Sequence, residues 1–338
     1  MRIKTWLKWL GGMLLIAVIT VVIAFEVSPK PGTKLIQFAF NREVPIRDAG
    51  HFAQAKETVN VVKNERYDSK YAQNTFDIYY PKNLKKHEQV PVIFWLHGGG
   101  YLAGDKSLVN EFAHYVATKE HIAVISANYE LAPELQYPGQ VQQLEDVYRY
   151  VTENAKKYPY IDFTKVAFGG DSAGAQIAGQ FVLIQTNPAY AKQMNMPATV
   201  PMDRLKAFIS YSGPVDLQQL KTLPATNLFM KFFARTVAWD LIGDKEWKQH
   251  PAVDEASIAQ HVTADFPPTY ITDGNTFSFP EQGKALERAL KAKHVPVEGL
   301  FFDKDHGDIY HEYQFSYHLK EAQQALDETL LFLRDYMK

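Results

Sequence analysis

The sequence contains no cysteine. Disulfides, thiolate metal sites and cysteine nucleophiles are therefore excluded together. The absence of cysteine does not identify the cellular compartment, because many secreted proteins lack disulfides. The chain also lacks an excess of one charge, since 36 Lys and Arg face 38 Asp and Glu, and it has no long basic stripe. Nucleic acid is therefore not an expected partner. The 11 histidines lack the spacing of metal ligands, so we expect no metal site.

Only one long apolar run is present, and it lies at the N-terminus. Residues 9–25 carry no basic or acidic side chain and follow Arg2, Lys4 and Lys8. At 1.5 Å per residue the run spans about 25 Å, which is short but workable for a transmembrane helix. We predict that residues 1–26 form an uncleaved signal anchor, with the basic end inside the cell and the remainder outside.

A cleaved signal peptide is the main alternative for this segment. Such a peptide normally ends in a small-x-small cleavage site, and Ala24-Phe25-Glu26 matches that pattern poorly. If cleavage did occur, the protein would be secreted rather than anchored in the cell membrane.

The remaining chain is long enough for one large α/β domain. Apolar runs and amphipathic stretches alternate along it, and the run at residues 90–96 is typical of a strand buried on both faces. We predict a mostly parallel sheet with helices on both faces, in a catalytic domain at 59–338 that follows a linker and N-terminal segment at 27–58. The predicted strands are 59–66, 75–80 (a hairpin), 90–96, 122–128, 166–169, 207–211, 269–272 and 297–302, and the predicted helices are 108–118, 141–158, 175–185, 280–293 and 317–336.

The regular alternation breaks between residues 213 and 266. This segment holds aromatic and amphipathic pieces, including residues 228–241. We interpret it as an insertion over the carboxyl edge of the sheet, where it forms either a lid or substrate wall or a purely structural excursion.

Residues 170–174 read Gly-Asp-Ser-Ala-Gly and match the G-x-S-x-G motif. A predicted strand precedes the motif and a small-residue helix follows it, as the motif requires. A sharp turn between strand and helix would expose the Ser172 hydroxyl and direct the N–H groups of the helix start toward it. We therefore predict that Ser172 is a nucleophile rather than an ordinary turn serine.

A second glycine-rich motif, His97-Gly98-Gly99-Gly100, follows the buried strand at 90–96. Its glycines allow the backbone to approach a ligand and to present N–H groups. With the amide of Ala173, those of Gly99 and Gly100 would form an oxyanion hole, where each donor contributes about 3 kcal/mol. His97 itself is expected to be structural. A phosphate-binding loop is disfavoured because Asp105 shifts the register before Lys106.

These motifs resemble the hormone-sensitive-lipase-like esterases of the α/β-hydrolase fold, and in particular bacterial membrane-anchored members. The resemblance runs from about Pro91 to the C-terminus, and it includes Asn-Tyr-Glu-Leu-Ala-Pro-Glu at 128–134 and His-Val-Thr-x-x-Phe-Pro-Pro at 261–268. It implies an α/β-hydrolase fold and the chain order nucleophile, acid, histidine. The family's nucleophile and oxyanion glycines correspond to Ser172, Gly99, Gly100 and Ala173.

The acid and the histidine are less well defined. The resemblance places the acid just after the seventh strand, where Asp273 is the nearest carboxylate, and Asn275 is the alternative orienting group. The family has His-Gly-Phe after the eighth strand. His311, in His-Glu-Tyr, keeps the aromatic residue and is our choice as catalytic base, with His306 as the alternative.

The expected function is hydrolysis of short to medium apolar carboxylic esters through an acyl-enzyme on Ser172. Aromatic residues in the insertion and around Tyr101 favour an apolar pocket, and no cofactor is implied. An amidase or peptidase using the same triad, and a hydrolase-fold binding module without catalysis, remain as alternatives. The sequence gives no indication of the oligomeric state.

Overall fold

A computed structural model describes residues 2–41, 45–223 and 228–338. Residue 1 of the predicted anchor, residues 42–44 of the N-terminal segment and residues 224–227 of the predicted insertion lie outside the described residues.

The body is built on one eight-stranded sheet with the order β1-β2-β4-β3-β5-β6-β7-β8. The first two strands form the predicted antiparallel hairpin, β2 pairs with β4 antiparallel, and the other neighbouring strands are parallel. The carboxyl ends of the parallel strands therefore meet at one edge of the sheet, where ligand sites of open α/β sheets form. The strands are β1 (Val59–Arg66), β2 (Thr75–Pro81), β3 (Val90–Leu96), β4 (Ala123–Ala127), β5 (Ile161–Asp171), β6 (Leu205–Tyr211), β7 (Thr269–Asp273) and β8 (Val297–Phe301).

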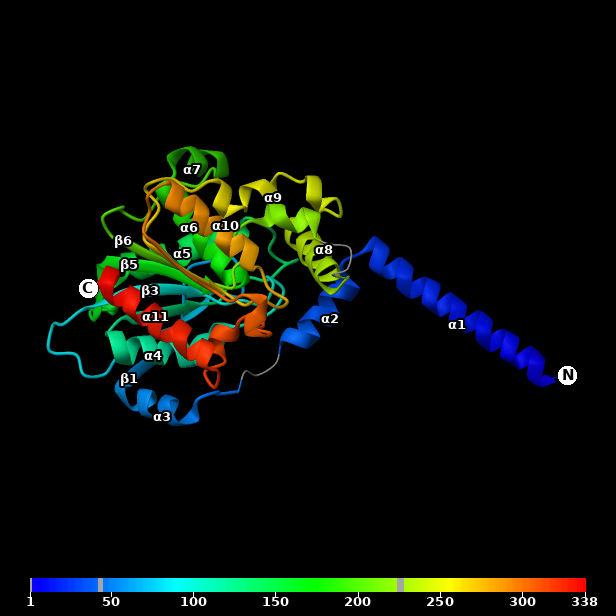
Figure 1. The fold of residues 1–338 in the computed structure, drawn as a ribbon, viewed down its shortest axis with the longest axis horizontal. Coiled ribbons are helices and arrows are strands. Elements are labelled where there is room, and N and C mark those ends of the chain that lie inside the picture. Colours follow the sequence, from blue (N-terminus) through cyan, green and yellow to red (C-terminus); the bar gives the residue numbers. More distant parts are fainter. Residues whose placement is uncertain (1, 42–44, 224–227) are drawn as a thin grey trace.

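Helices cover both faces of the sheet, as the sequence predicted (Figure 1). One face packs against α5 (Gly139–Glu153), α6 (Ala173–Thr186) and α10 (Pro280–Ala292). The opposite face packs against α3 (Ala49–Thr58), α4 (Asn110–Glu120) and α11 (Lys320–Met337). The short helix α7 (Pro188–Met194) follows α6.

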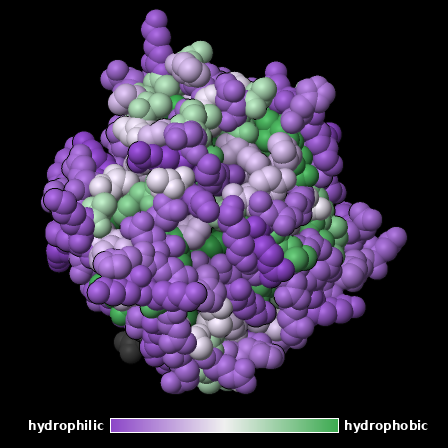
Figure 2. Space-filling view, turned by 90° about the vertical axis from the view of Figure 1, so that its left-hand side faces the viewer, coloured by the Kyte–Doolittle hydropathy of each residue, from purple (hydrophilic) through white to green (hydrophobic). Residues whose placement is uncertain are grey.

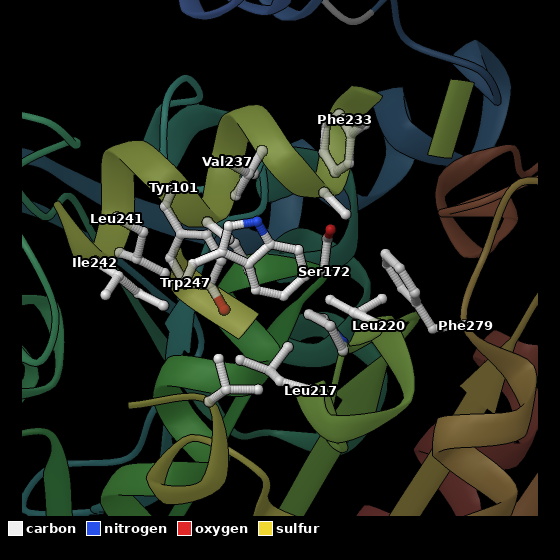
Figure 3. Close-up of a pocket in the computed structure, with 16 residues that line it drawn as sticks. Tyr101, Ser172, Leu217, Leu220, Phe233, Val237, Leu241, Ile242, Trp247 and Phe279 are labelled. Carbon is white, nitrogen blue, oxygen red and sulfur yellow. The ribbon is translucent and has the colours of Figure 1, made fainter. Parts of the chain in front are cut away.

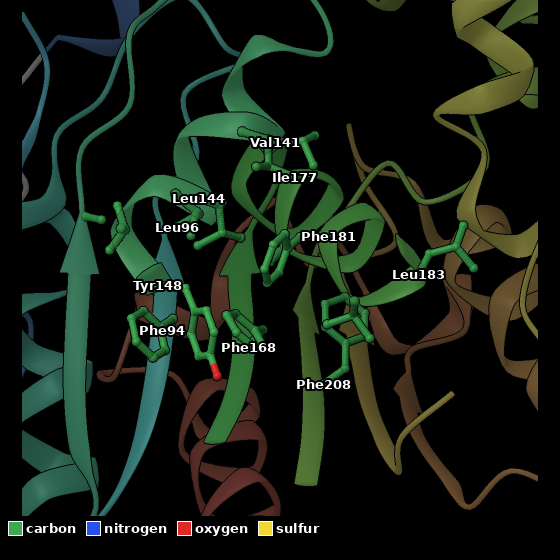
Figure 4. Packing of buried hydrophobic residues seen from close by; sticks show 14 of the residues in the cluster. Phe94, Leu96, Val141, Leu144, Tyr148, Phe168, Ile177, Phe181, Leu183 and Phe208 are labelled. Carbon is green, nitrogen blue, oxygen red and sulfur yellow. The ribbon is translucent and has the colours of Figure 1, made fainter. Parts of the chain in front are cut away.

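The core between the sheet and the first group of helices contains a cluster of aromatic rings among aliphatic side chains (Figure 4). The Phe94 and Phe168 rings on neighbouring strands stack with centroids 5.3 Å apart, and Phe181 of α6 meets Phe168 edge-on at 5.0 Å. All three side chains are fully buried. Each contributes about 2–3 kcal/mol by burial, so this cluster fixes α6 on β5 and thereby positions the turn that joins them.

The N-terminal helices lie at the carboxyl edge of the sheet. Helix α1 (Arg2–Val27) extends away from the body, whereas α2 (Lys30–Phe40) packs on α8 (Leu228–Ile242) of the predicted insertion (Figure 1). Thr33 of α2 donates a hydrogen bond to Asp240 of α8. The contacts of α2 and α8 connect the N-terminal segment to the insertion, which also contains the short helix α9 (Ala252–Glu255).

Several element boundaries differ from the prediction. The strand expected at 166–169 extends over Ile161–Asp171, and the helix expected from 175 begins at Ala173, directly after Ser172. The last helix begins at Lys320 rather than 317 because residues 313–315 form a separate 3-10 turn. Helices α3 and α7 were not predicted, since each is too short to show a clear apolar period.

Candidate active site

Ser172 lies at the tip of the turn between β5 and α6. Its backbone has φ 48° and ψ −119°, a strained conformation for a non-glycine residue. The Ser172 amide donates a hydrogen bond of 2.8 Å to the Tyr211 carbonyl of β6, which ties the turn to the sheet. A Cβ at Gly174 would lie 2.0 Å from the Leu96 carbonyl oxygen, so only glycine allows α6 to pack this close to β3.

The glycine-rich loop after β3 is held against this turn by Asp171. The Asp171 carboxylate accepts hydrogen bonds from the Gly98 amide at 2.6 Å and from the Trp95 indole N–H at 2.7 Å. Gly99 has φ +112°, and its carbonyl accepts the Ala103 amide at 3.1 Å. The loop and the turn that carry the predicted oxyanion donors are thus joined by a buried carboxylate.

His97 has a structural environment, as the sequence suggested. Its Nδ1 lies 2.7 Å from the Gly98 carbonyl oxygen, and its ring stacks on Tyr129 at a centroid distance of 4.4 Å. Burial lowers the pKa of the His97 imidazole to about 4, so the ring is neutral at pH 7.

His311, rather than His306, reaches Ser172. Its Nε2 lies 2.9 Å from Ser172 Oγ, and burial lowers the pKa of the His311 imidazole to about 4. A neutral imidazole at this position can accept the hydroxyl proton. His306 instead lies 2.9 Å from the Glu321 carboxylate at the start of α11.

Ser278 stands between His311 and Asp273. Ser278 Oγ lies 2.6 Å from His311 Nδ1 and donates a hydrogen bond to Asp273 Oδ1. Asp273 Oδ2 also accepts the Phe279 amide at 2.9 Å. The predicted acid is therefore linked to the histidine through a hydroxyl group instead of contacting it directly. Burial raises the pKa of Asp273 to about 7, although the hydrogen bond from Ser278 acts in the opposite direction and lowers this pKa.

Asn275, the alternative orienting group, has a different role. Its side-chain amide donates to the carbonyls of Asp303 at 3.0 Å and Gly307 at 2.7 Å, and its oxygen accepts the Ile309 amide at 2.9 Å. Asn275 therefore holds the loop that precedes His311. Sequence reasoning missed Ser278, because a loop serine five residues after Asp273 belongs to no motif.

A second carboxyl group, Glu312, lies beside the site. It follows His311, where the resemblance has glycine, and its φ of 57° lies in the left-handed region that glycine enters without strain. Burial and the neighbouring charge of Asp171 raise the pKa of Glu312, and the two side chains share a hydrogen bond. Its Oε1 is 3.9 Å from His311 Nε2. Two carboxyl groups can share a hydrogen bond only when one of them is protonated, so this arrangement holds a proton between Glu312 and Asp171.

Ser172 lies where two cavities meet. The narrow cavity, of 50 Å³, is bounded by apolar side chains from the insertion, including Leu217, Leu220 and Trp247 (Figure 3). The wide cavity, of 720 Å³, opens past His311 and Glu312. Phe233 of α8, in the segment predicted to be an insertion, lines both cavities.

No group of three or more His, Cys, Asp or Glu residues in the part of the chain that the structure describes is arranged to hold a metal ion.

Comparison with known proteins identifies the family. The BD-FAE family model matches residues 76–290, a span that contains the glycine-rich loop, Ser172 and Asp273. The chain belongs to the BD-FAE family. This confirms the predicted resemblance to hormone-sensitive-lipase-like esterases. His311 lies beyond the matched BD-FAE residues, so its assignment depends on the geometry alone.

Relatives of this BD-FAE chain include esterase LipI of Mycobacterium tuberculosis, which is 29% identical over 225 residues. That alignment covers 65% of this chain and 66% of LipI. An acetyl esterase of Salmonella schwarzengrund is 29% identical over 108 residues, which are 32% of each chain. The chain therefore matches about two thirds or less of these curated relatives' length.

Solved structures share the fold. Inhibited esterase B from Lactobacillus rhamnosis superposes with a TM-score of 0.68 at 22% identity, covering 94% of this chain and 96% of that one. The α/β-hydrolase fold predicted from the sequence is thereby confirmed.

Proposed function

We propose that this protein is a serine carboxylesterase with Ser172 as nucleophile and His311 as general base. The observation that carries the proposal is the 2.9 Å distance between Ser172 Oγ and His311 Nε2. This distance is within reach for direct proton transfer from a serine hydroxyl to an imidazole.

The hydrogen bonds around His311 favour one tautomer. Ser278 donates a hydrogen bond to Asp273, so Ser278 Oγ can accept a hydrogen bond from the Nδ1–H group of His311. His311 Nε2 then carries the lone pair that faces Ser172. In this arrangement the buried Asp273 carboxylate stabilises the imidazolium that forms during attack, acting through Ser278.

The reaction proceeds by acyl transfer. Ser172 Oγ forms a bond to the ester carbonyl carbon while its proton passes to His311, and the imidazolium then protonates the departing alkoxide. In the second half His311 takes a proton from a water molecule as the water oxygen bonds to the acyl carbon. The bond from that carbon to Ser172 Oγ then breaks, Oγ regains a proton from the imidazolium, and the carboxylic acid leaves. The amides of Gly99, Gly100 and Ala173 would bind the negatively charged oxygen; Gly99 lines the wide cavity, and Gly100 and Ala173 line the narrow one.

The two cavities suggest how the substrate is oriented. The narrow apolar cavity suits a short acyl group, and the wide cavity suits a larger alcohol portion. The name of the Salmonella relative, an acetyl esterase, is compatible with a short acyl group. We accordingly propose short-chain esters of bulky apolar alcohols as the substrate class.

We further propose that α1 anchors the protein in the cell membrane, with the catalytic domain outside the cytoplasm. An 18-residue window within residues 6–27 has a mean hydropathy of 2.5, and none of that window is buried against the body. Such a helix is long enough to cross a bilayer. Secretion after cleavage of this segment is the alternative, and the mass of the native N-terminus distinguishes the two.

A panel of nitrophenyl esters and matched nitroanilides tests the function. We expect turnover of acetyl to butyryl esters, weak or no turnover of amides, and loss of activity in a folded Ser172→Ala variant. Ester turnover that persists in this variant would remove Ser172 from the mechanism. Amide turnover above ester turnover would assign the protein to the amidases, and a folded wild type without either activity would indicate a binding module.

A further inference from the structure

Exposed apolar side chains gather at the mouth of the wide cavity. Outside α1, most of the large apolar residues that are exposed in the described part of the chain come from α2, the start of α8 and two loops beside Ser172. They are Leu35, Phe38, Phe40, Leu228, Phe229, Phe277 and Tyr310, each exposed by 40–77%. The remaining three, Ile46, Met202 and Leu331, are scattered. Such a concentration marks an interaction surface rather than ordinary surface composition.

Four of these residues, Phe40, Phe229, Phe277 and Tyr310, line the wide cavity itself, and we refer to them as the aromatic rim. Phe229 meets Phe277 at a centroid distance of 5.8 Å, and Phe277 stacks on Tyr310 at 6.3 Å. Phe233 connects the other side, at 6.3 Å from Phe229 and 5.8 Å from Phe40. The rim is therefore one connected aromatic surface, and it leads directly to Ser172.

Helix α1 leaves the body beside this rim. Glu26, near the end of α1, pairs with Arg235 of α8 at 3.0 Å and with Lys245 at 3.3 Å, and Phe25 contacts Phe232 at a centroid distance of 6.2 Å. Arg235 is six residues from Phe229 in the same helix, which corresponds to about 9 Å. Phe229 of the rim therefore lies on the same helix as Phe232 and Arg235, which contact the end of α1.

The connection to α1 is also short. Only Ser28 and Pro29 separate the end of α1 from the start of α2. The body therefore cannot move far from a bilayer that α1 enters, and α1 leaves the body on the side that carries α2 and α8 (Figure 1). The face on the opposite side of the body is predominantly hydrophilic (Figure 2).

Resting on the esterase function and membrane anchor proposed above, we propose that the aromatic rim docks on the bilayer surface that α1 enters, and that the wide cavity receives ester-bearing amphiphiles from it. Aromatic rings are favoured at the level of the lipid headgroups. Docking removes the exposed apolar rim from water and places the cavity entrance against the lipid. The amphiphile's apolar alcohol portion then enters the site without crossing water.

The absence of cysteine makes the docking directly measurable. Single-cysteine variants of the full chain, Leu228→Cys and Phe277→Cys, are labelled with a nitroxide in phosphatidylethanolamine and phosphatidylglycerol vesicles, with Met202→Cys as the control on another surface. We expect the labels at 228 and 277 to be more accessible to oxygen than to a water-soluble nickel chelate, and the label at 202 to show the reverse. Labels that are more accessible to the nickel chelate at all three positions overturn the proposal. Labels at 228 and 277 that are shielded from both reagents also overturn it, and would indicate a protein partner.

A kinetic test uses Leu228→Asp, because Leu228 is 74% exposed and lines neither cavity, and Met202→Asp as the matched control. We expect Leu228→Asp to hydrolyse water-soluble nitrophenyl acetate like the wild type, but to hydrolyse hexadecyl acetate in vesicles about tenfold more slowly. Equal rates on the vesicle substrate would contradict docking. The esterase proposal is tested separately by Ser172→Ala, which should lose activity on both substrates. If Ser172→Ala is inactive but Leu228→Asp matches the wild type on vesicles, the esterase function stands and only the docking proposal fails.

Discussion

Ser278 Oγ lies 2.6 Å from His311 Nδ1 and donates a hydrogen bond to Asp273, so a hydroxyl group connects the imidazole to the buried carboxyl group. In the proposed mechanism this serine lengthens the hydrogen-bond chain from Ser172 to Asp273 by one link.

Removal of this link should impair chemistry more than binding. In Ser278→Ala we expect kcat to fall about 10²-fold, because His311 loses the partner that fixes its tautomer, while KM changes little. Steady-state kinetics on nitrophenyl acetate measures both. Ser278→Thr, which keeps the hydroxyl, is the control and should retain most of the activity. An unchanged kcat in a folded Ser278→Ala variant would show that the hydroxyl plays no part.

The pH dependence of activity should reflect Asp273. Because burial raises the pKa of Asp273 to about 7, the carboxylate that stabilises the imidazolium is lost as the pH falls through this value. We therefore expect kcat/KM to decline below about pH 7. In Asp273→Asn this decline should disappear, leaving the His311 ionisation near 4 as the acid limit of a much slower reaction. An identical acid limb in both proteins would assign it to another group.

The Glu312 and Asp171 pair should make the fold sensitive to alkaline pH. Burial raises the pKa of Glu312 in the folded chain, whereas an unfolded glutamate titrates near its ordinary value of about 4.3. Above that value the folded state binds more protons than the unfolded state, so the free energy of unfolding decreases as the pH rises.

Glu312→Gln keeps a donor for Asp171 but cannot ionise, so it should escape this loss. Thermal unfolding at pH 5 and pH 8 tests the difference, and we expect the variant's Tm advantage to grow by about 2 °C or more between the two. An advantage that stays constant with pH would mean that the pair does not share a proton.

The narrow cavity should set the acyl-chain preference. Leu217 and Leu220 line the narrow cavity beside Ser172, so Leu217→Ala and Leu220→Ala should each enlarge this cavity (Figure 3). We expect each to raise the ratio of kcat/KM for the hexanoyl ester to that for the acetyl ester about tenfold, since one or two methylene groups contribute about 1–3 kcal/mol. Leu331→Ala, at a 52% exposed position on α11, is the control. An unaltered ratio would place the acyl group in the other cavity.

The sequence predicted those parts of the site that depend on local structure. Ser172 and the loop around Gly99 follow buried strands directly, and their glycines are required by close backbone packing, so the motifs identify both. The fold class followed from the alternation of apolar runs and amphipathic stretches, which the eight-stranded sheet confirms.

The parts that were not predicted depend on contacts between distant segments. Ser278 acquires its role only because the loop after β7 meets the loop that carries His311. Glu312 departs from the glycine of the resemblance, and its partner Asp171 lies far away in the sequence. The sequence already favoured His311 over His306, and in the fold His311 lies beside Ser172 whereas His306 lies beside Glu321.

Covalent labelling with a fluorophosphonate tests the central assignment most directly, because the reagent reacts only with an activated serine. Intact mass and peptide mapping of the wild type should show one adduct per chain, located at Ser172. Ser172→Ala should remain unlabelled, and His311→Ala should react at least about 10²-fold more slowly. An adduct on another residue, or equal labelling of a folded Ser172→Ala variant, would contradict the assignment of Ser172 as the nucleophile.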